Sequence, residues 1–209
     1  MFDGMGHEYR CVVEESARGA VRLDVLEEVA AARPESPLSL ALAVALLKGE
    51  KFDLVVQKAT ELGVRRIIPV VTKQADVRLR DEADGARRVA RWQRIALEAA
   101  KQSGRTLVPA VAAPRRFTSL VEAEDEHEAW RVMFSEREGR SLSGTFDERG
   151  ASANMMALIG PEGGWTDEEI TQARASNWNI VTLGGRILRA ETASIAVVVL
   201  LQHLFGDLR

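Results

Sequence analysis

The stretch Leu158–Thr192 contains two segments rich in glycine, Gly160-Pro161-Glu162-Gly163-Gly164 and Leu183-Gly184-Gly185-Arg186-Ile187-Leu188-Arg189-Ala190-Glu191-Thr192. Each segment follows a short apolar run, 155–159 or 179–183, of the kind that forms a buried strand of a parallel sheet. The sequence therefore predicts two parallel strands, each of which ends in a glycine loop.

A helix is predicted between the two glycine segments. Thr166 is followed three residues later by Glu169, which is the spacing of a capping box, and the helix extends to about Ser176. Ligands of open α/β sheets bind beyond the carboxyl ends of the strands, where glycine lets backbone amides approach closely. Two glycine loops at one edge of a parallel sheet therefore predict a cofactor site in an α/β fold.

The composition is that of one globular domain with room for a small additional unit. The chain has 209 residues, of which 46% are hydrophobic and 28% are charged. No apolar run reaches the roughly eighteen residues of a membrane span and no signal-peptide pattern opens the chain, so a cytoplasmic protein is expected. The single cysteine, Cys11, excludes an internal disulfide, and three histidines far apart in the sequence argue against a metal site.

The remaining elements are predicted from hydrophobic periodicity. Residues 1–35 have the pattern of a small β unit, and strict alternation over Leu38–Leu46 predicts the first strand of the main sheet. The β unit has strands at Tyr9–Val13 and Ala20–Leu26 and is followed by a linker at Pro34–Pro37. Beyond the first main strand, the pattern predicts strands at Arg65–Val71 and Arg131–Phe134 and helices at Lys51–Leu62, Ala86–Ser103 and Glu191–Phe205.

Two of these elements carry further expectations. Pro69 lacks a backbone N–H, so its strand is expected to lie at an edge of the sheet or to end in a bulge. The last helix is apolar nearly all round between Ile195 and Leu201, so it is expected to be buried in the core or in an oligomer interface.

Charge is unevenly distributed although the net charge is only −3. Residues 65–116 contain thirteen Lys or Arg and five Asp or Glu, whereas residues 117–177 contain five and thirteen. One anion-facing surface would produce this asymmetry, and so would solvated helix faces that pair with each other. The cations of the second predicted helix form one stripe, which either follows a phosphate backbone or is only a solvated surface: Arg87, Arg91, Arg94 and Lys101.

Several common chemistries do not match the glycine segments. Neither segment contains the Gly-Lys-Ser/Thr of a Walker loop or the Gly-x-Gly-x-x-Gly of a dinucleotide site. No Gly-x-Ser-x-Gly occurs and no histidine lies near either glycine segment, which argues against a serine hydrolase. His203, on the last helix, is interpreted as a packing or surface residue.

The two glycine segments, extended to Gly160–Thr166 and Leu183–Ala193, resemble the paired signature of the 16S ribosomal RNA uridine-N3 methyltransferases, a family within the knotted SPOUT class. Gln57–Val64 and Glu98–Arg105 resemble two further segments of the same family. Because all four segments occur in the family's order over Leu38–Arg209, the resemblance is specific.

The resemblance implies a SPOUT-type parallel α/β sheet in residues 38–209, with a C-terminal trefoil knot at about 155–205. Periodicity alone gives no sign of a knot. The resemblance also implies a homodimer, a 16S rRNA substrate in the small ribosomal subunit and S-adenosylmethionine as the methyl donor. Phe134 is expected to form an apolar wall for the adenine. The family's other cofactor positions map onto Gly160, Glu162, Gly163, Gly164, Leu183, Gly184, Ile187, Leu188 and Arg189.

Methylation of uracil N3 requires removal of the N3 proton and stabilisation of the resulting imide anion. A cation near O2 or O4 would stabilise the anion, and Arg189 or Arg105 is expected to supply it. A carboxylate would accept the proton, and Glu191 or Glu61 is the expected base. Glu191 could equally be a first-turn carboxylate that complements the helix dipole. Arg105, which follows the basic stripe, is also a candidate RNA contact.

The resemblance is incomplete at the N-terminus. Members of the family carry a complete β-barrel of the PUA type that docks RNA, whereas residues 1–35 match only part of such a barrel. Two alternative functions remain open. Another member of the knotted class would methylate a ribose 2′-hydroxyl, and a cofactor-binding or RNA-binding remnant would have no turnover.

Overall fold

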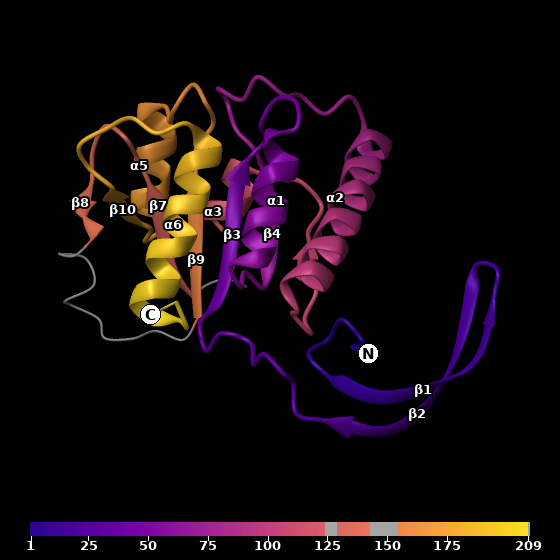
Figure 1. The fold of residues 1–209 in the computed structure, drawn as a ribbon. Coiled ribbons are helices and arrows are strands. Elements are labelled where there is room, and N and C mark those ends of the chain that lie inside the picture. The colour runs from indigo at the N-terminus through magenta and orange to yellow at the C-terminus, as the bar shows by residue number, and fades with distance from the viewer. Residues whose placement is uncertain (124–128, 143–153, 209) are drawn as a thin grey trace.

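The computed structural model describes residues 1–123, 129–142 and 154–208, which form a three-layer α/β/α body and a two-stranded ribbon (Figure 1). The central sheet has the order β5-β4-β3-β9-β7-β10-β8, and β6 pairs with β4. The pairings between its described strands are all parallel, which confirms the predicted α/β class. The strands are β3 (Ser39–Ala45), β4 (Arg66–Val71), β5 (Ala110–Val111), β6 (Arg115–Arg116), β7 (Trp130–Phe134), β8 (Arg140–Ser141), β9 (Asn154–Ile159) and β10 (Asn179–Thr182).

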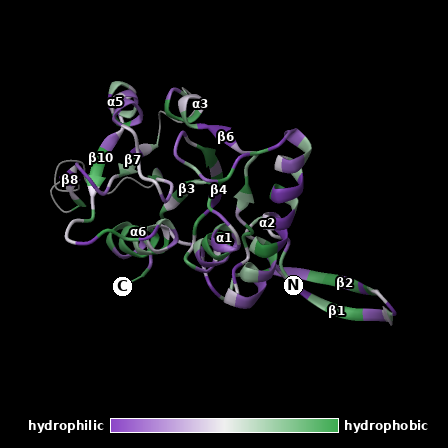
Figure 2. Ribbon diagram, turned by 90° about the horizontal axis from the view of Figure 1, so that it is seen from above, coloured by the Kyte–Doolittle hydropathy of each residue, from purple (hydrophilic) through white to green (hydrophobic). Residues whose placement is uncertain are grey.

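Helices cover both faces of the sheet (Figure 2). α1, α2 and α6 lie on one face, and α3 and α5 lie on the other. Two hydrophobic clusters fill the two layers between sheet and helices: Leu40 and Leu42 of β3 belong to the first, and Ala43 belongs to the second. β3 is therefore apolar on both faces, because both faces of the sheet are buried. The helices are α1 (Lys51–Glu61), α2 (Glu82–Ser103), α3 (Phe117–Val121), α5 (Asp167–Ala175) and α6 (Ala190–Phe205).

The expectation that Pro69 marks an edge strand or a bulge is wrong. β4 pairs continuously with β3 on one side and with the two short strands β5 and β6 on the other. On the second side, β5 pairs with residues 66–67 and β6 with residues 70–71, so Ile68 and Pro69 have no partner there. The backbone carbonyl of Ile67 accepts its hydrogen bond from the side of β5 and β6. Backbone groups of alternate residues in a strand face the same side, so the backbone nitrogen of Pro69 faces that side as well. The missing N–H of Pro69 thus falls in a gap between two short strands.

The second helix begins four residues earlier than predicted. The Asp81 side chain accepts a 2.7 Å hydrogen bond from the backbone N–H of Asp84, so Asp81 is the N-cap. Gly85 then lies inside the first turns, packed beside Pro114, rather than before the helix. Gly104 ends the helix with a φ of 73°, the left-handed conformation that favours glycine.

The last helix is only partly buried. Val197, Val198 and Leu201 of α6 are fully buried in the core, in agreement with the prediction. Val199 and Leu204 of the same helix, however, keep 39% and 49% of their surface exposed. None of the helices in the described part of the chain is long and apolar enough to cross a membrane.

The N-terminal ribbon consists of β1 (Glu8–Ala17) and β2 (Ala20–Val29), which pair antiparallel and are longer than predicted. The ribbon extends away from the body beside the C-terminal end of α2 (Figure 1). Two backbone hydrogen bonds hold its start to the segment after α2, Gly6 N–H to Thr106 O at 3.1 Å and Val108 N–H to Gly4 O at 2.9 Å. Most side chains of the ribbon are exposed to solvent.

Candidate functional site

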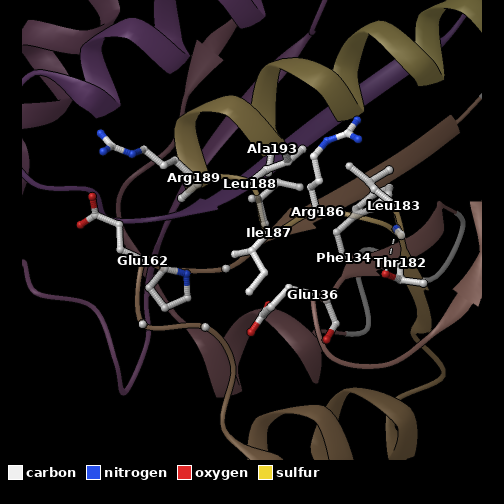
Figure 3. A pocket seen from close by; sticks show the side chains of 18 of the residues that line it. Phe134, Glu136, Glu162, Thr182, Leu183, Arg186, Ile187, Leu188, Arg189 and Ala193 are labelled. Carbon is white, nitrogen blue, oxygen red and sulfur yellow. Dashed lines mark hydrogen bonds between the residues drawn. The ribbon is translucent and has the colours of Figure 1, made fainter.

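A cavity of about 760 Å³ lies beyond the carboxyl ends of β7, β9 and β10 (Figure 3). Its walls are the last residue of each of these strands and the residues that follow it, namely 134–136, 159–164 and 182–190. Lys51 at the start of α1 and Ala193 of α6 complete the lining. Parallel strands that end at one edge of a sheet create such a crevice, which is where the two glycine loops predicted it.

The structure brings together all ten positions that the family resemblance implied for a cofactor. They come from the ends of three strands that are far apart in the chain, yet each lines the same cavity. Of the four catalytic candidates, Arg189 lines the cavity, whereas Glu191, Arg105 and Glu61 are not part of its lining. The ten positions are Phe134, Gly160, Glu162, Gly163, Gly164, Leu183, Gly184, Ile187, Leu188 and Arg189.

Gly160 is required by the indole ring of Trp165. A Cβ atom at position 160 would lie 2.9 Å from the ring, closer than carbon atoms approach without displacement. Trp165 is 2% exposed, and its Nε1 donates a 2.8 Å hydrogen bond to the backbone carbonyl of Phe134. The first glycine loop is therefore folded over a buried tryptophan, which also fixes the end of β7.

Gly163 and Gly164 are surrounded by side chains from two other loops. A Cβ atom at Gly163 would lie 3.0 Å from the side-chain oxygen of Gln74, in the loop after β4. Gly164 has a φ of 74°, and a Cβ atom there would overlap the carboxylate of Glu136. Gly164 therefore needs glycine for its backbone conformation, and a side chain at either position would displace a neighbouring side chain.

The predicted capping box is present at the start of α5. Thr166 Oγ1 accepts the backbone N–H of Glu169 at 3.2 Å, and the Glu169 carboxylate accepts that of Thr166 at 3.0 Å. Glu169 is 2% exposed, and its second oxygen accepts the backbone N–H of Lys73 at 3.1 Å. One buried carboxylate thus joins the end of the first glycine loop to the loop after β4.

The second glycine loop is open to solvent. Gly184 and Gly185 have φ values of 71° and 67°, and no atom lies within 4 Å of a Cβ built on either residue. Thr182 Oγ1 accepts a 3.1 Å hydrogen bond from the N–H of Gly184 (Figure 3). The side chain of Ile187 is 85% exposed although it lines the cavity. Glycine is therefore needed at these two positions for the left-handed backbone conformation and not for close packing.

Five charged side chains surround the cavity. Lys51 and Glu162 form an ion pair that connects the start of α1 with the first glycine loop. Glu136, Arg186 and Arg189 also line the cavity and are exposed. Sequence reasoning missed Lys51, Glu136 and Arg186 as site residues. Glu136 could have been found from its spacing to Phe134, which was expected in the site. Alternate residues of an extended chain face the same side, and Glu136 is two residues after Phe134. Lys51 carried no such signal, since only the tertiary fold places α1 beside the glycine loop.

Arg105 has a different environment from the one expected. Its side chain is 8% exposed and pairs with Glu35, with Nη2 2.6 Å from a carboxylate oxygen. Nη1 donates to the carbonyl oxygens of Thr60 at 2.7 Å and Val64 at 3.0 Å. The guanidinium therefore ties the linker before β3 to the end of α1, and the protein itself occupies its donors.

The two candidate bases also lie outside the cavity lining. Glu61 accepts hydrogen bonds from Lys58 at 2.9 Å, one turn before it on α1. Glu191 lies in the first turn of α6, two residues after Arg189. Its Oε2 is buried and has no hydrogen-bond partner within the described residues. Glu191 is thus the candidate with a free acceptor beside the cavity.

The basic stripe of α2 is largely paired with carboxylates of the protein. Arg91 Nη2 lies 2.5 Å from Asp53, and this hydrogen bond raises the pKa of Arg91. Arg87 lies 3.7 Å from Asp84, and Lys101 lies 2.8 Å from Glu98. Arg94 is exposed and forms no ion pair with any described residue. No group of His, Cys, Asp or Glu that could hold a metal ion occurs in the described ranges.

A family model described as an RNA methyltransferase domain matches residues 34–202, which is most of the chain. The chain belongs to this RNA methyltransferase family. A curated relative from Synechocystis, named ribosomal RNA small subunit methyltransferase E, is 37% identical over 194 residues. That alignment covers 92% of the chain and 61% of the relative, so the chain spans less than two thirds of the relative's length.

Solved structures similar to this RNA methyltransferase domain contain a cofactor. A ribosomal RNA small subunit methyltransferase E from Neisseria gonorrhoeae, bound to S-adenosyl methionine, superposes with a TM-score of 0.88 at 34% identity. The match covers 100% of the chain and 83% of that structure. A methyltransferase from Legionella pneumophila, also in complex with S-adenosyl methionine, superposes with a TM-score of 0.88 at 31% identity. That match covers 99% of the chain and 82% of the Legionella structure.

Proposed function

We propose that the chain is an S-adenosylmethionine-dependent methyltransferase that methylates N3 of a uridine in 16S rRNA of the small ribosomal subunit. The observation that carries the proposal is the cavity, which is lined by both glycine loops of an RNA methyltransferase domain. The cofactor in the similar Neisseria structure and the name of the Synechocystis relative support the donor and the substrate.

The residues of the cavity fit this cofactor. A volume of about 760 Å³ is within the range of small-molecule sites, about 300–1,000 Å³. Phe134, Leu183 and Leu188 offer apolar surface to an adenine ring, and the glycine loops expose backbone groups to a ligand. When bound, S-adenosylmethionine supplies an electrophilic methyl group on a cationic sulfur.

The proposal includes a finer architecture. Residues 38–209 form a SPOUT domain with a trefoil knot at about 155–205, and residues 1–35 form part of a PUA-like unit that docks RNA. The exposed apolar side chains Val199 and Leu204 of α6 support a homodimer, because burial of exposed apolar side chains favours association. A ribosomal substrate also favours a cytoplasmic place of action.

Arg189 and Glu191 are the residues that we assign to the chemistry. Arg189 is exposed at the cavity, where its permanent charge would stabilise the negative charge on uracil O2 or O4 as N3 is deprotonated. Glu191 has an unpartnered carboxylate oxygen two residues further on, suited to accept the N3 proton. Arg105 and Glu61 receive no catalytic role, because both are engaged with other residues of the protein.

RNA contacts are assigned to the exposed cations of α2. Arg94 is the best candidate for a phosphate contact because no described carboxylate neutralises it. Arg87, Arg91 and Lys101 can contribute only if their pairs with Asp and Glu open or are shared. The buried Arg105 is not available to a phosphate.

Transfer of tritium from methyl-labelled S-adenosylmethionine tests the proposed function. The acceptors are 30S subunits and naked 16S rRNA from a strain that lacks the enzyme. Labelling of either acceptor supports the proposal, and the comparison identifies the substrate state. Cofactor binding without labelling of either acceptor would instead support a binding protein without turnover.

A further inference from the structure

We propose that the carboxylate of Glu136 binds the ribose hydroxyls of the adenosyl cofactor. The inference rests on the proposed function, because it assumes that the cavity holds S-adenosylmethionine. It goes beyond that function by assigning recognition of the sugar to a side chain that no glycine segment contains.

The fold places Glu136 in the wall of the cavity. It follows β7 by two residues, after Phe134, and lines the cavity beside the first glycine loop. In Figure 3 its side chain points toward Ile187 in the middle of the site, whereas the side chain of Glu162 points out to one side. Gly164 has no side chain to obstruct the carboxylate, since a Cβ atom there would overlap it.

The Glu136 carboxylate has no strong partner of its own. No described residue donates a hydrogen bond to it, and its nearest cation is Arg137, whose Nε lies 4.0 Å away. Arg137 uses its other nitrogens elsewhere, on Asp167 at 3.0 Å and on the carbonyl of Trp165. The second carboxylate of the cavity, on Glu162, is instead paired with Lys51. Glu136 is thus the cavity carboxylate with free acceptor oxygens.

Its neighbours favour the sugar as the group that it binds. The apolar side chains of Phe134 and Leu183 line the cavity near the end of β7 and provide the surface for the adenine. If the adenine lies against Phe134, the carboxylate of Glu136, two residues further on, lies next to the ribose to which the adenine is attached. Carboxylates bind ribose diols in nucleotide sites because two acceptor oxygens match two hydroxyl donors.

The test compares ligands as well as variants. Calorimetry measures the affinity of the wild-type protein, Glu136→Gln and the control Glu138→Gln for three ligands: S-adenosylhomocysteine, its 2′-deoxy analogue and 5′-methylthioadenosine. Glu138 is on the same loop but pairs with Arg174 at 2.9 Å and does not line the cavity. We expect Glu136→Gln to bind S-adenosylhomocysteine about tenfold more weakly, because it loses a charge-assisted hydrogen bond. The variant should bind the deoxy analogue nearly as well as the wild type does.

Four results would overturn the inference. Unchanged affinity of Glu136→Gln would remove Glu136 from the site. An equal loss for both ligands would show that the carboxylate supports the glycine loop instead of the sugar. A loss for S-adenosylhomocysteine but not for 5′-methylthioadenosine, which has the ribose and lacks the amino acid, would assign Glu136 to the ammonium group. Failure of the wild type to bind any adenosyl ligand would refute the proposed function, and the inference with it.

Discussion

The indole Nε1 of Trp165 donates a 2.8 Å hydrogen bond to the backbone carbonyl of Phe134. This bond joins the first glycine loop to the end of β7, two of the three segments that form the cavity. The same ring lies where a side chain at position 160 would have to be. The shape of the cavity therefore depends on one buried aromatic residue as much as on the glycines.

A substitution at Gly160 should destabilise the fold through this ring. Gly160→Ala is expected to lower the free energy of unfolding by about 1–3 kcal/mol, because the new methyl group overlaps the indole. In a Trp165→Phe background the ring atoms in conflict are absent, so the cost of the alanine should shrink. Urea denaturation of the four proteins measures the coupling. Equal costs of Gly160→Ala in both backgrounds would show that the ring is not the reason for the glycine.

The buried pair of Arg105 and Glu35 should be structural. Arg105→Lys is expected to lower the free energy of unfolding by about 3–5 kcal/mol, since a lysine cannot replace the bidentate guanidinium and leaves the buried carboxylate poorly paired. Lys101→Ala removes an exposed pair with Glu98 on the same helix and should cost about 0–1 kcal/mol. If the lysine variant at position 105 is as stable as the wild type but loses activity, Arg105 has a functional role instead.

The ion pair of Lys51 and Glu162 should hold the first glycine loop in place. Lys51→Glu is expected to raise the KM for S-adenosylmethionine about two- to fivefold, because two carboxylates then face each other at the cavity. The double variant Lys51→Glu/Glu162→Lys should recover most of the loss. If the changes in KM caused by the two single substitutions simply add in the double variant, the two side chains act independently.

Arg189 should act on the reaction rather than on folding. Arg189→Ala is expected to lower kcat about 10²–10³-fold, the usual cost of removing one group that stabilises a developing anion. Its affinity for the cofactor and its thermal stability should stay close to wild type, since the side chain is exposed. Arg186→Ala, which removes a second exposed cation of the cavity, is the matched control. Near wild-type turnover of Arg189→Ala would rule out the assigned role.

The N-terminal ribbon should have a pH-dependent contact. The Glu28 carboxylate accepts a hydrogen bond from the His7 ring and raises the pKa of His7, and the two atoms, Oε1 and Nδ1, lie 2.8 Å apart. The contact therefore stabilises the ribbon below the unfolded histidine pKa of about 6.5, and the contribution is lost as the pH rises through the raised folded pKa. NMR titration of His7 in the wild type and in Glu28→Gln checks the direction. A pKa that does not fall in the variant would exclude Glu28 as the cause.

Local patterns were sufficient for the centre of the molecule. The alternation in residues 38–46, the apolar run before Gly160 and the capping box at Thr166 each depend on neighbours in the sequence, and each element forms where it was predicted. The two glycine loops followed from the same logic, whereas the ten cofactor positions were implied by the family resemblance; all ten line one cavity.

The errors arose where tertiary packing decides the structure. Pro69 is accepted inside the sheet because two short neighbouring strands leave a gap, which no local pattern reveals. Arg105 looked like a free cation because its partner, Glu35, lies 70 residues away in the sequence. Lys51 was missed for the same reason, because Glu162, the residue with which it pairs at the cavity, lies on a loop far away in the sequence.

The central claim is tested most directly by nucleoside mass spectrometry of the product. 30S subunits from a strain that lacks the enzyme are incubated with S-adenosylmethionine and the protein, and the 16S rRNA is then digested to nucleosides. The account predicts one new 3-methyluridine per rRNA with the wild-type protein and almost none with Arg189→Ala. A methyl group on a ribose 2′-oxygen, or no new methylated nucleoside with either protein, would contradict it.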